Sequence, residues 1–282
     1  MKKALVIATV LSMAFVSALF AWNWPWMTKS ANKLTLSGST TVLPLAQKAA
    51  EVYMQKNSGA DITVRGGGSG VGIAALIDST TDIADASRPM QSSEIAKAKS
   101  KGVNPVGTII CKDGISIVVN AAANSMTDIT LEQIKGIYTG AIKNWKDLGG
   151  TDMQIVVISR DSSSGTFEVF NEKVLKGAKL REDALMTASN QEVAAAVEKT
   201  PGAVGYIGLG FVTDKLKALV VDGTAPSEET VLSGKYELSR PLYMYTNGDP
   251  AGLQKDFIDF ILSDDGQKIV KEVGYVPLNG GK

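Results

Sequence analysis

The chain has 282 residues, of which 44% are hydrophobic and 21% are charged, as is typical of a globular protein. Lysine and arginine together number 29, as do aspartate and glutamate, so the net charge is zero and no general positive field favours nucleic acid. The sequence has no histidine, which excludes a Ser-His-Asp or Cys-His catalytic unit and the commonest zinc sites. Its one cysteine, Cys111, excludes an intrachain disulfide, and its β-branched neighbours predict a small buried hydrophobic residue.

The N-terminus has the pattern of an export signal. Two lysines precede an apolar run from Ala4 to Ala21 that only hydroxyl residues interrupt, and cleavage could follow Ala21 or Ala31. Retention as a membrane anchor stays open, because the run is near the minimum length of a spanning helix and three tryptophans follow it. We expect residues 1–31 to be a signal peptide or an anchor. The chain is then exported to the periplasm or to the outer face of the cytoplasmic membrane.

The first predicted unit is a strand, a hydroxyl loop and a helix. A short strand over Leu34–Ser37 leads into Ser39, Thr40 and Thr41. Pro44 is suited to the first turn of the helix that follows, whose apolar residues recur at helical spacing.

A second unit repeats this arrangement. A strand over Ile62–Val64 leads through a glycine-rich loop containing Ser69 to a helix over Val71–Ile77. The glycines resemble a dinucleotide fingerprint only weakly, because no suitably placed acidic residue follows to hold a ribose. No Gly-Lys-Ser/Thr follows either, so nucleotide binding is disfavoured.

A third loop contains Ser87 and Arg88, between a short strand in the segment Asp82–Ser87 and a helix over Ser92–Lys99. Two interpretations of Arg88 stay open. It contributes to an anion site, or it forms a surface ion pair with Asp85 or Glu94.

The fourth such junction follows a β-branched run over Ile155–Ile158. Arg160, Ser164, Gly165 and Thr166 lie between this strand and a helix that starts near Phe167. The free N–H groups of a helix's first turn, its positive dipole end and hydroxyl donors together form an anion socket, to which arginine adds a forked charged donor. The alternative is an ordinary helix cap, for which serine and threonine are preferred.

The remaining pattern also alternates strands and helices, which predicts an α/β architecture with mainly parallel sheets. The segments Val106–Cys111 and Ile115–Asn120 are two strands or one long strand with a kink. The other predicted helices and strands are Leu131–Tyr138, Glu192–Lys199, Gly202–Gly210, Leu219–Val221, Leu242–Tyr245, a helix containing Leu253–Ile261, and Asp264–Val273.

The four hydroxyl loops are expected at one edge, because ligands of parallel α/β sheets bind at the carboxyl ends of strands beside helix N-termini. One such loop is a cap, whereas four with arginines nearby predict a cage for one small anion. Charge-assisted hydrogen bonds contribute about 1.5–3 kcal/mol each, so a few of them suffice for tight binding.

The chain resembles the phosphate-binding proteins of the periplasmic solute-binding superfamily (type II), which deliver phosphate to an ABC permease. The resemblance covers residues 34–278. It rests on four motifs in order: Ser-Gly-Ser-Thr-Thr (37–41), Gly-Gly-Gly-Ser-Gly (66–70), Asp-Ile-Ala-Asp-Ala-Ser-Arg-Pro (82–89) and Arg-Asp-Ser-Ser-Ser-Gly-Thr (160–166).

This resemblance implies a set of ligand contacts from the four loops. In one branch of the family an aspartate at the third loop accepts the proton of hydrogen phosphate, whereas this sequence has Ser87, as other members do. Asp85 or a serine oxygen would then take that role, and Asp161 is expected to orient Arg160. The predicted phosphate-binding residues are Ser39, Thr40, Thr41, Ser69, Ser87, Arg160, Ser164, Gly165 and Thr166.

The resemblance further implies two α/β lobes joined by crossing strands that close over the ligand by a hinge. We expect lobe I to comprise residues 32–114 and 217–282, and lobe II residues 115–216. The crossings are predicted near Lys112–Ile115 and Leu216–Leu219.

The predicted function is therefore a non-enzymatic, monomeric phosphate receptor for an ABC permease, with no cofactor, no metal and no nucleic acid. One alternative is a receptor for sulfate, molybdate or tungstate, because a cage of donors alone does not reject a fully ionised anion. An exported serine hydrolase or phosphatase using Ser164 with a lysine base is disfavoured, because no Gly-x-Ser-x-Gly motif surrounds that serine. A further alternative, suggested by the possible N-terminal anchor, is a surface-retained scaffold or anion sensor.

Overall fold

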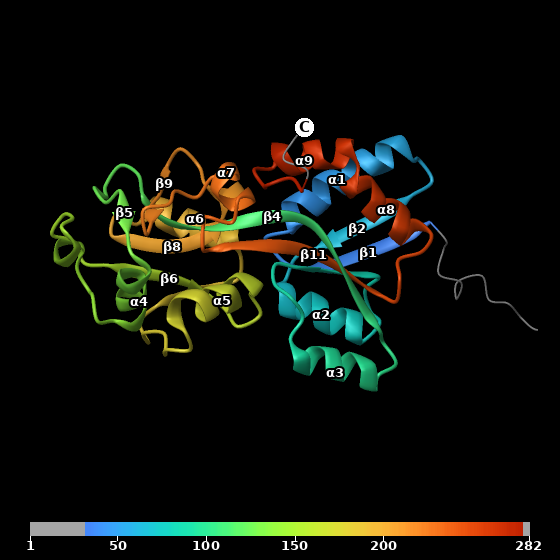
Figure 1. Ribbon diagram of the computed structural model, residues 1–282, viewed down its shortest axis with the longest axis horizontal. Helices are drawn as coiled ribbons and strands as arrows, with labels where there is room; N and C mark the ends of the chain where they lie inside the picture. Colours follow the sequence, from blue (N-terminus) through green and yellow to red (C-terminus); the bar gives the residue numbers. More distant parts are fainter. Residues whose placement is uncertain (1–31, 279–282) are drawn as a thin grey trace, which may run out of the picture. The chain divides into compact units, whose positions relative to one another are not determined.

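The computed structural model describes residues 32–278, so the predicted signal or anchor over residues 1–31 lies outside the described residues. Figure 1 shows two groups of elements joined by two long strands, β4 and β11. The strands are β1 (Lys33–Gly38), β2 (Asp61–Arg65), β3 (Ile83–Ala86), β4 (Pro105–Asn120), β5 (Asp128–Ile129), β6 (Val156–Arg160), β7 (Leu185–Thr187), β8 (Ala203–Gly208), β9 (Leu216–Ala218), β10 (Val220–Val221) and β11 (Ser239–Asn247). The α-helices are α1 (Leu43–Lys56), α2 (Ser69–Ile77), α3 (Ser92–Ser100), α4 (Leu131–Thr139), α5 (Gly165–Phe170), α6 (Asn190–Lys199), α7 (Glu228–Leu232), α8 (Leu253–Leu262) and α9 (Asp264–Glu272).

Helices begin where the sequence supplies capping groups. Pro44 lies in the first turn of α1, and the Thr130 side chain accepts from the Gln133 N–H at the start of α4. Ser189 and Ser263 cap α6 and α9 in the same way. α5 continues into a π-helical turn over Asn171–Leu175.

One sheet runs through both groups in the order β2-β1-β3-β11-β4-β8-β6-β7, with β9 paired to β4. β1 pairs in parallel with β2 and β3, and β6 pairs in parallel with β7 and β8. β4 and β11 run antiparallel to their neighbours. The predicted two-lobed α/β fold is confirmed. Its sheet is mixed, because the two crossing strands oppose the parallel strands on either side.

β4 is one continuous strand that belongs to both lobes. It pairs with β11 from Pro105 to Gly114 and with β8 from Ile115 to Val119, so its partner changes at the predicted first crossing. Leu242 faces Cys111 while Tyr243 faces Ile109, so the register shifts by one residue within β4. Of the two sequence interpretations, the single long strand with an irregularity is the one observed.

The second crossing strand is β11 and not the segment near Leu216–Leu219. β9 pairs with Val118–Asn120, at the lobe II end of β4, and Leu219 packs in the core that contains Ile117. Tyr236 and Leu238 are buried in that same core. The prediction of a crossing near Leu216–Leu219 is therefore wrong, because residues 216–238 bury their apolar side chains in lobe II before the chain returns.

Lobe I has a core on each face of its strands. α1, α8 and α9 cover one face, where Leu36, Leu45 and Phe257 are buried, and α2 and α3 cover the other (Figure 1). Cys111 is fully buried in the first of these cores, as predicted, and burial raises its pKa well above the usual value.

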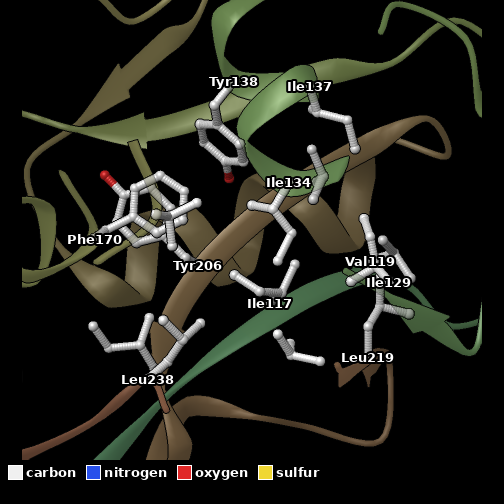
Figure 2. Packing of buried hydrophobic residues seen from close by; sticks show 14 of the residues in the cluster. Ile117, Val119, Ile129, Ile134, Ile137, Tyr138, Phe170, Tyr206, Leu219 and Leu238 are labelled. Atoms are coloured by element: carbon white, nitrogen blue, oxygen red, sulfur yellow. The ribbon is translucent and has the colours of Figure 1, made fainter. Parts of the chain in front are cut away.

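The core of lobe II is rich in aromatic rings. Figure 2 shows Tyr138, Phe170 and Tyr206 packed together, and the rings of Phe170 and Tyr206 stack with centroids 4.1 Å apart. Trp145 is fully buried, and its indole N–H donates to the Gly202 carbonyl at 3.0 Å. This packing anchors α5 and β6, the two elements on either side of the fourth hydroxyl loop.

Candidate anion-binding site

The four hydroxyl loops meet where the two lobes face each other. The Thr41 and Thr166 hydroxyl oxygens, one from each lobe, lie 3.1 Å apart. A Cβ atom added to Gly165 would lie 2.4 Å from Ser69 Oγ and 2.8 Å from Ser87 Oγ, so only glycine permits this approach. The structure thus brings the predicted loops together in a closed arrangement. Thr40 is half-buried, and the other predicted site residues are buried: Ser39, Thr41, Ser69, Ser87, Arg160, Ser164, Gly165 and Thr166.

One of these serines, Ser164, caps a helix, and Ser39 accepts from backbone N–H groups in the turn before another. Ser39 Oγ accepts from the Thr41 and Val42 N–H groups before α1, and Ser164 Oγ accepts from the Phe167 N–H at the start of α5. Capping occupies oxygen lone pairs and leaves each hydroxyl proton available as a donor. The capping and anion-site interpretations are therefore compatible for Ser164, and Ser39 likewise keeps its proton available.

Arg160 is a buried cation whose charge is not neutralised by a contacting carboxylate. Its side chain is held by the Thr187 carbonyl at 3.2 Å from Nε and by the Ala188 carbonyl at 2.8 Å from Nη2. Nη2 also donates to Thr40 Oγ1 at 3.2 Å, whereas the buried Nη1 has no hydrogen-bond partner within residues 32–278. Burial lowers the pKa of Arg160, since desolvation disfavours its charged form. The hydroxyl cluster thus contains a buried guanidinium with one N–H group that has no partner among the described residues.

Asp161 does not hold Arg160 as expected. Its Oδ1 accepts from the backbone N–H of Ser163 at 2.8 Å and from the Ser163 hydroxyl at 2.5 Å. The charge of Asp161 opposes the lowering of the Arg160 pKa, but burial outweighs it. The orienting role falls instead to the two backbone carbonyls.

Arg88 does not contribute to the anion site. Its Nη1 and Nη2 donate to the two oxygens of Glu94 at 2.7 and 2.8 Å. Its Nε lies 2.6 Å from Glu168 Oε2, on α5 of lobe II, which also accepts from Gln91 Nε2 at 2.6 Å. Arg88 does pair with Glu94, but the arginine is buried and the pair is not at the surface as predicted; Glu168 extends the pair across the two lobes. Because two carboxylates already neutralise its guanidinium charge, Arg88 is not available to a ligand.

A second contact between the lobes is formed by backbone. The Gly70 N–H donates to the Ser163 carbonyl at 3.0 Å, and Ser163 Oγ, whose proton is shared with Asp161, lies 3.0 Å from the Gly67 carbonyl. Gly68, which has φ +102°, approaches so closely that an added Cβ would lie 2.4 Å from Ser163 Oγ. The glycine-rich loop therefore serves close packing between the lobes, which explains its glycines without a nucleotide.

Asp85 is a buried acid without a partner. Its side chain is fully buried, and neither of its carboxylate oxygens has a hydrogen-bond partner in the described residues. Desolvation raises its pKa well above the ordinary value. No hydrogen bond links it to Ser87, so a role for Asp85 as proton acceptor stays a prediction.

Three polar residues at the site were not predicted from the sequence. Asn190, the first residue of α6, donates to Thr40 Oγ1 at 3.3 Å and to Thr41 Oγ1 at 3.0 Å. Arg240 of β11 donates to Thr41 Oγ1 at 3.3 Å and pairs with Asp113 of β4 at 2.8 Å. Burial raises the pKa of Asp113, although the adjacent guanidinium acts in the opposite direction. This buried ion pair links the two crossing strands directly beneath the hydroxyl cluster.

The described residues hold no group of three or more histidine, cysteine, aspartate or glutamate side chains arranged to bind a metal ion. Over the same residues, no helix is long and apolar enough to cross a membrane.

Comparison with known proteins places this geometry in a family. Residues 27–265 match the model of the PBP superfamily domain. The phosphate-binding protein PstS of Bacillus subtilis is 37% identical over 256 residues, which are 90% of this chain and 83% of the relative.

Solved structures of phosphate-binding proteins have the same fold. A substrate-binding protein from Clostridium perfringens with bound phosphate superposes with a TM-score of 0.82 at 35% identity, over 87% of this chain and 99% of that one. An ABC-type phosphate transport receptor from Vibrio cholerae superposes with a TM-score of 0.71 at 35% identity, over 86% and 99% of the two chains. The chain therefore belongs to the PBP superfamily and, within it, to the family of phosphate-binding proteins PstS.

Proposed function

We propose that this protein is an extracytoplasmic receptor that captures inorganic phosphate between its two lobes and delivers it to a membrane-embedded ABC permease. The observation that carries the proposal is the buried, unpartnered Nη1 of Arg160, surrounded by hydroxyl groups from both lobes. A buried cation without a counter-charge is costly, and a bound anion removes that cost. The relatives are named as binding proteins, in keeping with a receptor that performs no catalysis, and we propose that it works as a monomer.

The nine predicted residues form the proposed binding site, with different contributions. Arg160 supplies the charge, and Thr40, Ser69, Ser87 and Thr166 supply hydroxyl donors. Gly165 and the first turn of α5 supply backbone N–H groups at the positive end of the helix dipole. Ser39, Thr41 and Ser164 complete the cluster and hold its loops in place.

We propose that closure occurs about β4 at Asp113–Gly114 and about β11 at Ser239–Arg240, where the chain passes between the lobes. Lobe I then comprises residues 32–114 and 239–278, and lobe II residues 115–238. This moves the second predicted boundary from residue 217 to residue 239, because residues 216–238 pack with lobe II. The Arg240–Asp113 pair lies at this hinge, and the Arg88–Glu168 pair joins the two lobes in the arrangement described here.

Calorimetric titration of the phosphate-depleted protein with phosphate, and then with sulfate, molybdate and tungstate, tests the proposal. Micromolar or tighter phosphate binding that a thousandfold excess of sulfate does not displace supports it. Equal binding of phosphate and sulfate would assign a general oxyanion receptor, which the donor-rich cage and Ser87 make the second candidate. Binding of none of these anions would refute the receptor function.

A hydrolase has little structural support. Ser164 Oγ accepts from the Phe167 N–H, and none of the hydrogen bonds described for residues 32–278 joins Ser164 to a lysine amine. A nucleophilic serine needs such a base to remove its proton.

A further inference from the structure

Asn190 has an amide whose orientation is fixed by its surroundings. The side chain is fully buried, and its Oδ1 accepts from the backbone N–H of Gly208 at 3.2 Å. Because a backbone N–H can only donate, the amide oxygen must face Gly208. The amide NH₂ group therefore faces Thr40 Oγ1 at 3.3 Å and Thr41 Oγ1 at 3.0 Å, and it can only donate to them.

The Thr41 hydroxyl oxygen accepts hydrogen bonds from two donors. One is Asn190 Nδ2 and the other is Arg240 Nη2 at 3.3 Å, which cannot accept. A hydroxyl group has one proton and two lone pairs, so both lone pairs of Thr41 Oγ1 are filled. Its proton then points to Thr166 Oγ1, 3.1 Å away, and Thr166 must direct its own proton elsewhere.

The Thr40 hydroxyl is in the same situation. Its oxygen accepts from Asn190 Nδ2 and from Arg160 Nη2 at 3.2 Å, and both of these groups are obligate donors. No acceptor for the Thr40 proton is found among the described residues. This proton is left for a group that is not part of the protein.

We infer that Asn190 is a positioning residue that fixes the polarity of the hydrogen bonds at the anion site. Together with Arg240 and Arg160 it fills the lone pairs of Thr40 and Thr41, so that Thr40 and Thr166 present protons to the ligand. The inference rests on the proposed phosphate function and adds a specificity element to it. At the Thr40 hydroxyl a ligand oxygen must be unprotonated, because both lone pairs of Thr40 Oγ1 are filled and a ligand O–H would find no acceptor there.

A double-mutant cycle on the full chain tests the inference. Asn190→Ala leaves the two threonine hydroxyls free to turn, and we expect it to weaken phosphate binding by about tenfold or more. In a Thr40→Val/Thr41→Val background the same substitution should weaken binding by less than about threefold, because the hydroxyls through which Asn190 acts are gone. An equal factor in both backgrounds would show a merely structural role and overturn the inference. Absence of phosphate binding by the unmodified protein would instead refute the proposed function.

A spectroscopic measurement on the unmodified, phosphate-bound protein applies if the alanine variant does not fold. Scalar coupling between hydroxyl protons and ³¹P across hydrogen bonds should appear for Thr40 and Thr166 and should be absent for Thr41. Coupling from the Thr41 hydroxyl, or its absence from Thr40, would show the opposite polarity and overturn the inference.

Discussion

Replacement of Arg160 by methionine separates a ligand-binding role from a structural one. The substitution keeps the length of the side chain and removes its charge. A charge-assisted hydrogen bond contributes about 1.5–3 kcal/mol. The attraction of unit charges about 4 Å apart, at an effective dielectric constant of about 20, is about 4 kcal/mol and includes that bond. We therefore expect a loss of about 3–4 kcal/mol, which weakens phosphate binding by about 100- to 1,000-fold.

The same substitution should hardly change the stability of the phosphate-free protein. Arg160 is 1% exposed and desolvated, so its removal relieves an uncompensated charge while the Thr187 and Ala188 carbonyls lose a donor. We expect these effects to offset each other to within about 1 kcal/mol, a change of less than about 4 °C in melting temperature.

Calorimetry and thermal melts with and without phosphate measure both quantities. Arg65→Met is the matched control, because Arg65 ends β2 at the same edge of the sheet but is exposed. It removes the same charge and should change phosphate affinity by less than about twofold. If both variants lose affinity equally, a general charge effect is at work. If Arg160→Met lowers the melting temperature of the phosphate-free protein by more than about 8 °C, the arginine is primarily structural.

Three further predictions follow from burial and close contacts. Gly165→Ala places a Cβ 2.4 Å from Ser69 Oγ and should weaken phosphate binding at least about 100-fold in calorimetry. Gly59→Ala is the control: its added Cβ meets nothing closer than 3.6 Å, so phosphate affinity should not change. If the two variants bind phosphate equally well, the close contact between Gly165 and Ser69 does not matter for binding. Because the pKa of Asp85 is raised, this group is ionised only in the unfolded state between about pH 4 and the raised pKa, so its contribution to stability decreases as the pH rises through that range. Relative to wild type, Asp85→Asn should therefore gain about 1.4 kcal/mol per pH unit in urea unfolding up to the raised pKa, whereas a constant difference would refute the assignment. Trp145→Ala should lower the free energy of unfolding by about 3–5 kcal/mol, and a loss below about 1 kcal/mol would show that lobe II repacks around the cavity.

Elements with strong local signals were predictable from the sequence. The strand, loop and helix units before residue 100 and the junction at Arg160 follow from apolar spacing, proline and capping residues. β7 was missed because it has only three residues and two of them, Leu185 and Met186, are exposed. The crossing of β11 was missed because nothing local distinguishes a strand that passes between lobes from one that stays within a lobe.

For the site, too, local motifs were predictable and contacts between distant segments were not. Its hydroxyl loops are contiguous motifs, whereas Arg240 meets Thr41 from 199 residues away along the chain. Asn190 lies in a Ser-Asn-Gln-Glu segment, which locally indicates only the start of a helix. The two interpretations of Arg88 could not be decided from the sequence, in part because its partner Glu168 lies on the other lobe, where sequence proximity gives no signal. Contacts that depend on tertiary structure could not be inferred from spacing.

The return of the chain through β11 has a consequence for the order in which the protein folds. The core of lobe I needs Leu242 and Met244 of β11, Phe257 and Ile261 of α8, and Ile269 of α9. Lobe II is complete in sequence once residue 238 is available, since its core lies between Ile115 and Leu238 apart from Val276. During synthesis or translocation from the N-terminus, the first lobe to emerge is thus the last that can finish folding. We expect a nascent chain that stops near residue 238 to protect lobe II from protease while β1 to β3 remain cleavable.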